Sequence, residues 1–130
     1  MNIAKVFFSL LTNDATFAGL VSTKVYPDFA PQTVTLPYCV VSVIGVDPSD
    51  TKDGVSKLDI IGVQLDIYAN NYDTGLSIAD AARAALDRYS GTNNGQVIDS
   101  IRFDGQTSGQ FNYELKTFWC SQDYNVRMKL

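Results

Sequence analysis

The chain has 130 residues, of which 45% are hydrophobic and 18% are charged, so it is long and apolar enough to form a packed core. Ten basic residues against fourteen acidic ones give a net charge of −4, which argues against binding nucleic acid by neutralising its phosphates. The chain has no histidine, so the usual general base of serine and cysteine nucleophiles is absent. We expect one domain over residues 1–130, with no separate linker and no enzyme activity.

The sequence shows no pattern of a membrane span or a signal peptide. No apolar run is long enough to span a bilayer, and the opening MNIAKVFFSLLTNDATF lacks the pattern of a signal peptide. Cys39 and Cys120 both fall inside strand patterns, which favours two buried thiols in a reducing compartment over a disulfide. We therefore expect a protein that is made in the cytoplasm and has no membrane partner.

The first part of the chain predicts two helical pieces. Apolar residues recur at helical spacing from residue 3 to residue 11, and Asn2 can cap that helix. Asp14 can cap a second, shorter piece that contains Phe17, Leu20 and Val21. Residues 26–37 hold three prolines and predict irregular structure, apart from a short extended piece at residues 24–26.

Two strands and a helix are predicted next. Residues 38–46 are apolar at both odd- and even-numbered positions, which is typical of a central strand covered on both faces. Residues 47–57 predict an exposed loop, and odd-numbered apolar residues from 61 to 69 predict a strand with one buried face. Asp73 or Thr74 can cap the following helix, and Gly91 is expected to end it. One face of this helix is an apolar stripe of Leu76, Ala79, Ala82, Leu86 and Tyr89.

The last third predicts strands around a glycine-rich turn. Residues 97–103 form a strand pattern, GQTSG at 105–109 has turn composition, and apolar residues then alternate on odd positions from 111 to 115. The alternation continues on even positions from 118, so a β-bulge or a break is expected near residues 116–117. The fold class predicted is α+β, with a mainly antiparallel sheet of two hairpins and helices packed on one face.

Acidic residues around the 47–57 loop are the only plausible metal ligands. Asp47, Asp50, Asp53 and Asp59 offer oxygen atoms to calcium or magnesium, but their spacing does not match a calcium-binding loop. A solvated loop is the better interpretation, and no metal or cofactor is expected. A small metal-dependent hydrolase that uses this loop remains an alternative function.

Two aromatic residues lie at strand positions whose side chains are predicted to point away from the core. Tyr68 and Trp119 both fall on the faces assigned as polar. Partial burial under a loop would explain them, and so would a subunit interface, where tyrosine and tryptophan are enriched. The sequence does not decide between these two interpretations.

The order of several short motifs resembles one phage family. LPYCVVSV after a proline-rich lead, VQLDIYA, LSIADAARAALDR and the terminal DYNVRMKL occur in this order in the tail-completion proteins, or tail terminators, of long-tailed bacteriophages. The resemblance spans residues 25–126 and implies a small α+β protein without catalytic residues. It implies a homo-oligomeric ring, commonly a hexamer, that caps the head-proximal end of the tail tube, stops tube polymerisation and offers a head-attachment surface.

The resemblance also implies partners and a location. The partners are other copies of the chain, the tail-tube protein and a head–tail connector or stopper, with DNA only in passage, and the location is the virion after assembly in the host cytoplasm. A connector or stopper role is the closest alternative. The interface candidates are Tyr68, Trp119, Asp47, Asp50, Asp53 and Lys57, and the candidates to face the lumen are Asp50, Asp53 and Asp59.

Overall fold

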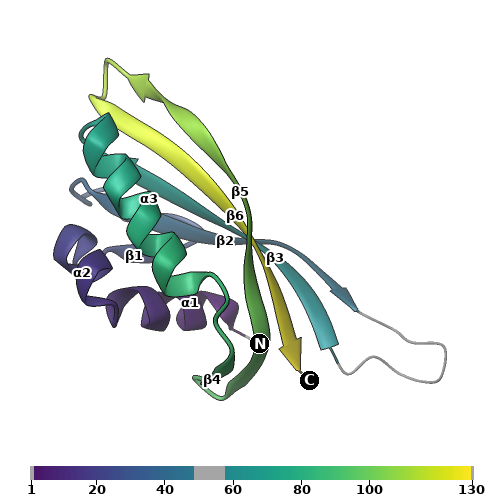
Figure 1. The fold of residues 1–130 in the computed structure, drawn as a ribbon. Helices are drawn as coiled ribbons and strands as arrows, with labels where there is room; N and C mark the ends of the chain where they lie inside the picture. The colour runs from purple at the N-terminus through teal and green to yellow at the C-terminus, as the bar shows by residue number, and fades with distance from the viewer. Residues whose placement is uncertain (1, 49–57, 130) are drawn as a thin grey trace.

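The computed structural model describes residues 2–48 and 58–129 (Figure 1). These residues form three helices, α1 (Ile3–Thr12), α2 (Ala15–Val21) and α3 (Tyr72–Leu86). They also form six strands: β1 (Val25–Pro27), β2 (Tyr38–Pro48), β3 (Leu58–Ala69), β4 (Gly91–Asn93), β5 (Gln96–Asn112) and β6 (Thr117–Lys129). Within this part of the chain no helix has the length and apolar character needed to cross a membrane.

The strands join in one curled sheet in the order β1-β2-β3-β6-β5-β4. The pairing of β1 with β2 is parallel and every other pairing is antiparallel. Figure 1 shows the three helices on one side of this sheet, which leaves the other side without helices. The mixed α and β composition and the mainly antiparallel sheet were predicted correctly. The sheet is larger than the two hairpins expected, because β1 and β4 extend its edges.

The first two helices begin at the residues that the sequence indicates. The Asn2 side chain accepts a hydrogen bond from the backbone N–H of Lys5 (3.2 Å), and that of Asp14 accepts one from Phe17 (2.9 Å). Each bond satisfies one backbone donor that the first turn of a helix leaves open. The short extended piece is also present, as β1, one residue later than expected.

The core lies between the helices and the inner face of β3 and β6. The odd-numbered residues of β3 from Ile61 to Ala69 are buried, as the alternation predicts. Their partners on β6 are the even-numbered residues from Phe118 to Val126, so both strands contribute the same face. The α3 residues Ile78, Ala79, Ala82 and Leu86 pack against this face.

The ends of α3 differ from the prediction. Asn71 caps the helix, through a hydrogen bond from the backbone N–H of Thr74 (2.8 Å), so neither Asp73 nor Thr74 is the cap. The helix ends at Leu86 rather than Gly91, because Asp87 leaves helical geometry and its side chain accepts a hydrogen bond from the backbone N–H of Phe103 (3.0 Å). Tyr89 therefore lies beyond the helix.

The path of β5 is the largest correction. GQTSG is not a turn: residues 105–109 lie within β5, where the register with β6 shifts at three places. The hairpin turn covers residues 113–116, so Tyr113 and Leu115 belong to the turn and not to a strand. The parity change near residues 116–117 is thus a break, and Lys116 adopts a positive φ of 49° there.

The prediction that β2 is a central strand holds for only half of its length. Cys39, Val40 and Val41 are buried, but every residue from Val43 to Pro48 is exposed. The pairing with β1 stops at Val41, and the rest of β2 extends beyond the helices (Figure 1). Asp47 was assigned to a loop and instead ends this strand, while residues 49–57 lie outside the described part of the chain.

Candidate assembly surfaces

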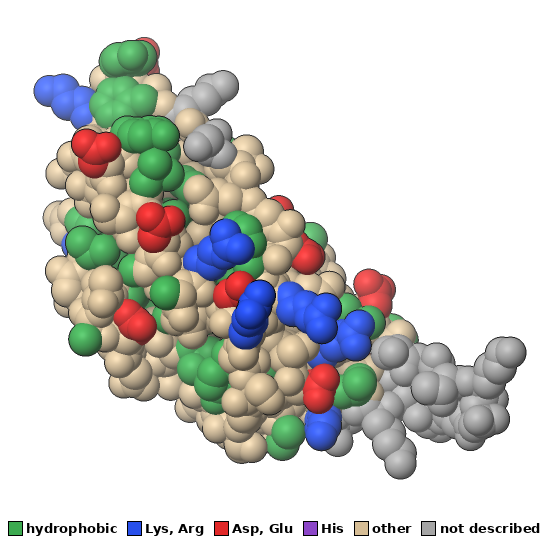
Figure 2. All heavy atoms as spheres, viewed as in Figure 1, with side chains coloured by type: hydrophobic (Ala, Val, Ile, Leu, Met, Phe, Trp, Pro, Cys, Tyr) green, Lys and Arg blue, Asp and Glu red, His purple; other side chains and the backbone are tan. Residues whose placement is uncertain are grey.

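Large apolar side chains are exposed at the turn between β5 and β6. Tyr113 is 84% exposed and Leu115 is 70% exposed, and the Phe111 ring packs edge-on against Tyr113 with a centroid distance of 5.0 Å. We call these three residues the hairpin tip. Figure 2 shows hydrophobic side chains gathered at this end of the molecule. The alternation of these residues predicted a strand and gave no sign of their exposure.

A second apolar surface lies along the exposed half of β2. Ile44 is 64% exposed, and Val43 and Val46 are each 43% exposed. Val43 and Val46 also border a hollow of about 420 Å³ at the start of α1, together with Pro27 and Val41.

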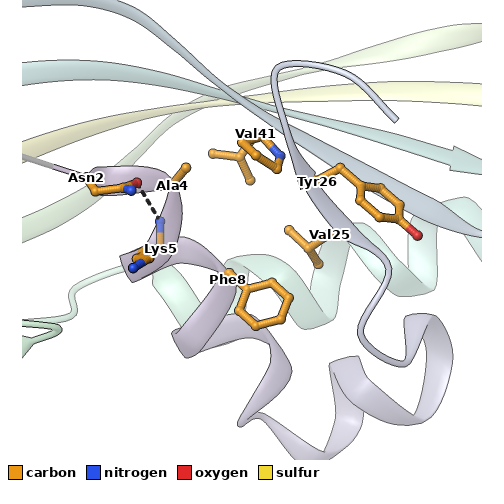
Figure 3. Close-up of a pocket in the computed structure, with 8 residues that line it drawn as sticks. Asn2, Ala4, Lys5, Phe8, Val25, Tyr26 and Val41 are labelled. Atoms are coloured by element: carbon orange, nitrogen blue, oxygen red, sulfur yellow. Dashed lines mark hydrogen bonds between the residues drawn. The ribbon is translucent and has the colours of Figure 1, made fainter. Parts of the chain in front are cut away.

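An adjoining hollow of about 340 Å³ lies between α1 and β1. Figure 3 shows Phe8, Val25 and Val41 directed toward this space. Both hollows are lined by Asn2, Ala4, Pro27 and Val41, and we treat them together as the α1 hollow. Apolar surface of this kind in a monomer is typical of an interaction site.

Tyr68 and Trp119 lie side by side on the face of the sheet that carries no helices. They are register partners on β3 and β6, and both are half-buried. The Tyr68 ring stacks on Tyr38 with a centroid distance of 4.8 Å, and the Trp119 indole N–H donates to Asp66 Oδ1 (3.3 Å).

Residues 28–34 contribute to a hollow next to Tyr68, so partial burial beside a loop is part of the explanation. The same hollow leaves part of the Tyr68 and Tyr38 rings accessible, so an interface role for Tyr68 and Trp119 stays a prediction. Burial raises the pKa of both Tyr38 and Tyr68, and the Asp66 carboxylate further raises that of Tyr68.

The predicted acidic residues are only partly described. Asp47 is exposed near the end of β2, and Asp59 is half-buried near the start of β3, opposite Pro48. Asp50, Asp53 and Lys57 lie outside the described residues. Among the described residues, no group of three histidine, cysteine, aspartate or glutamate side chains could hold a metal ion.

Both cysteines are buried free thiols on the inner face of the sheet. They flank Ile67, since Cys39 and Cys120 are its register partners on the two neighbouring strands. Burial raises the pKa of both thiols, and the Asp66 charge raises both further. A raised thiol pKa disfavours the reactive thiolate, so these cysteines behave as core residues.

A hollow lined by arginines lies where α3 meets β5, and it was not predicted from the sequence. Arg83, Arg88 and Arg102 line a space of about 570 Å³ together with Asp87 and Asp99. The Arg83 guanidinium lies over the Phe103 ring (4.1 Å) and only 3.9 Å from the Asp87 carboxylate. Figure 2 shows Lys and Arg side chains gathered on this side of the molecule. Arg102 is distant from Arg83 and Arg88 in the sequence, so no local pattern indicates the cluster.

A model of the family described as tail completion protein gp17 matches residues 5–129. The chain belongs to this family. The tail completion proteins are structural proteins of phage tails, so the resemblance seen in the sequence motifs is confirmed and extends toward both termini. Among curated proteins no relative matches the chain.

The fold of this tail completion family member has a counterpart in a solved structure. A chain of the virion of a native gene transfer agent (GTA) particle superposes with a TM-score of 0.74 at 19% sequence identity. The match covers 95% of the present chain and 92% of that chain. At this identity the likeness shows a shared fold.

Proposed function

We propose that this chain is a single-domain tail-completion protein that forms a ring at the head-proximal end of a phage tail tube. The ring stops polymerisation of the tube and provides the surface to which the head attaches. Its partners are further copies of itself, most simply six in the ring, then the tail-tube protein and a head–tail connector. The protein works in the virion after assembly in the host cytoplasm.

The observation that carries this proposal is the family match over residues 5–129. The exposed surface of the molecule supports it. Apolar side chains are exposed at two separate places, the hairpin tip and the outer half of β2, as expected for a subunit that contacts more than one neighbour.

Tail length is the decisive readout for this function. A phage that lacks the gene should assemble tubes longer than normal and without heads, because nothing ends polymerisation. A plasmid copy of the gene should restore both length and head attachment. Electron microscopy of lysates measures both quantities, and tubes of normal length without the protein would contradict a terminator role.

The same experiment addresses the connector or stopper alternative. Loss of a connector leaves tail length unchanged and prevents joining or retention of the genome in the head. Tubes of normal length beside emptied heads would therefore assign the chain to the head side of the junction.

A further inference from the structure

The sheet has an open edge at each side. On the β5 edge, Arg88 N–H donates to Ile101 O (2.7 Å), Ile101 N–H donates to Tyr89 O (3.0 Å) and Phe103 N–H donates to Asp87, which covers β5 as far as residue 103. Within the described residues, no strand pairs with this edge over 105–112. On the opposite edge, β1 and Asp28 cover β2 only as far as Val41, which leaves 42–48 open among the described residues, with Asp47 and Pro48 at the far end of this open stretch.

The central part of each open segment lacks charge and proline, although a β-bulge interrupts each of them. Residues 105–112 (GQTSGQFN) and residues 42–46 (SVIGV) contain no charged residue and no proline. Proteins commonly guard exposed edges with lysine, proline or inward-pointing charges, because an open edge offers unpaired N–H and C=O groups to another strand. Two edges with uncharged, proline-free centres therefore offer places where strands of other molecules can pair.

The directions of the two edges fit each other. Successive antiparallel pairings from β2 through β3 and β6 make β5 run opposite to β2. If copies continue the sheet in one orientation, β5 of one copy lies antiparallel to β2 of the next. Residues 42–46 span about 17 Å of strand, and the open part of β5 is longer. The hairpin tip then projects past Val41, toward Pro27 and Asp28.

The side-chain faces agree as well. Phe111 is the register partner of Phe118, whose side chain is buried on the helix side of the sheet. Val41 and Val43 are register partners of the buried Leu65 and Val63, so they also face the helix side. In a continuous sheet, the apolar tip of one copy therefore meets the α1 hollow of the next.

We propose that the chain self-assembles by pairing residues 105–112 of β5 with residues 42–46 of β2 of a second copy, whose α1 hollow receives the hairpin tip. This inference rests on the proposed function and names the surfaces that build the ring. The interface joins two different surfaces, so each copy uses both, and the assembly forms a ring when the rotation between neighbouring copies closes. Pairing of two β2 edges would instead be symmetric and stop at a dimer.

Two double variants block the two surfaces separately. Val43→Asp with Val46→Asp places charge beside the β2 edge and the hollow, and Tyr113→Asp with Leu115→Asp places charge on the tip. All four side chains are at least 43% exposed, so the fold should tolerate the changes, which circular dichroism and thermal melting check. Thr92→Asp, at an exposed position of β4, is the matched control.

Light scattering and native mass spectrometry over a concentration series should show ring assembly for the wild-type chain and the control. Each double variant alone should remain at the chain mass of 14.3 kDa. An equimolar mixture of the two should form a one-to-one dimer and nothing larger, because each variant retains the surface that the other lacks. Where the wild-type chain assembles, assembly of either variant alone, or a mixture that stays monomeric although both variants fold, would overturn the proposal.

Disulfide trapping extends the test to weak association. Tyr113→Cys and Asp28→Cys proteins, mixed and oxidised, should form a crosslinked dimer, while Thr92→Cys should not crosslink with either. Absence of the tip-to-edge crosslink refutes the pairing even where the wild-type chain scatters as a monomer. Tail length in the gene deletion is measured independently, so a failed crosslink beside overlong tails removes this interface and leaves the tail-completion function intact.

Discussion

Gln122 is the fully buried polar residue that joins α3 to the sheet. Its Nε2 donates to Ala79 O and to Gln106 Oε1, both at 2.9 Å, and its Oε1 accepts from the Tyr124 hydroxyl at 2.8 Å. Gln122→Leu leaves the buried Tyr124 hydroxyl without its acceptor. We expect this substitution to lower the free energy of unfolding by roughly 1–3 kcal/mol. Urea denaturation measures the loss.

The double variant Gln122→Leu with Tyr124→Phe provides the control for this network. It removes the stranded hydroxyl together with its acceptor, so part of the lost stability should return. A double variant that is less stable than the sum of the two single changes would contradict this account.

Tyr124 also makes stability depend on alkaline pH. Burial raises the pKa of its phenol, and the nearby Asp87 carboxylate raises it further. In the unfolded chain a tyrosine loses its proton near pH 10, whereas the native phenol retains its proton above that pH. The native state then binds more protons than the unfolded state, so stability is intact below about pH 10 and falls as the pH rises further.

The stability difference between wild type and Tyr124→Phe should therefore shrink between pH 8 and pH 11. Urea midpoints at a series of pH values measure it. A difference that stays constant over this range would show that the buried phenol contributes nothing to the alkaline loss.

At the scale of elements, α3 approaches the sheet through Gly75. A Cβ built on Gly75 would lie 2.6 Å from Phe118 Cε1, and the Phe118 ring is held in the core against Tyr72. Replacing glycine by alanine inside a helix normally stabilises it by about 0.5–1 kcal/mol. We expect Gly75→Ala to destabilise the protein by about 1–3 kcal/mol instead, because the extra methyl group overpacks this contact.

Gly19 in α2 is the matched control for Gly75, since a Cβ there meets nothing within 4 Å. Gly19→Ala should stabilise the protein by about the helix-propensity amount. Thermal or urea unfolding of the two variants decides the matter, and a change of the same sign at both positions would rule out the packing explanation.

The elements that the sequence predicted well are those set by local periodicity. The caps at Asn2 and Asp14 and the buried odd-numbered face of β3 follow from hydrogen bonding and alternation within a few residues. The path of β5 was not predicted from local sequence. The composition of GQTSG favours a turn, whereas pairing with β6 keeps these residues in a strand that contains register shifts.

The candidate surfaces depend on features still further from local sequence. Val43 and Val46 are exposed because their half of β2 extends beyond the helices that cover the first half (Figure 1). The arginine hollow requires residues 83, 88 and 102 to meet in space. In contrast, the alternation of apolar residues already placed Tyr68 and Trp119 on the face predicted to be polar, and the two residues do lie together.

At the scale of the whole molecule, charge decides how the protein treats DNA. Each chain carries a net charge of −4, and a ring repeats that charge in every subunit. Fixed positive charge would hold DNA through counterion release and slow its passage, so an acidic or neutral lumen suits a conduit. Asp47 and Asp59 are described acids at the β2–β3 end of the sheet, and Asp50 and Asp53 lie in the undescribed segment between these strands. Which of them face the lumen stays a prediction.

We therefore expect the purified protein to bind duplex DNA weakly or not at all in a gel shift at low salt, where electrostatic attachment is easiest to detect. The arginine hollow is the feature that most opposes this expectation, since Arg83, Arg88 and Arg102 gather positive charge in one place. The variant Arg88→Glu with Arg102→Glu removes that charge without touching the core, because both side chains are exposed. Tight binding by the wild-type chain that disappears with salt and in this variant would contradict the passive conduit and identify the hollow as a DNA contact. Equal, negligible binding by both proteins is the expected result, because the acidic surface repels the phosphates more strongly than three arginines beside Asp87 and Asp99 attract them.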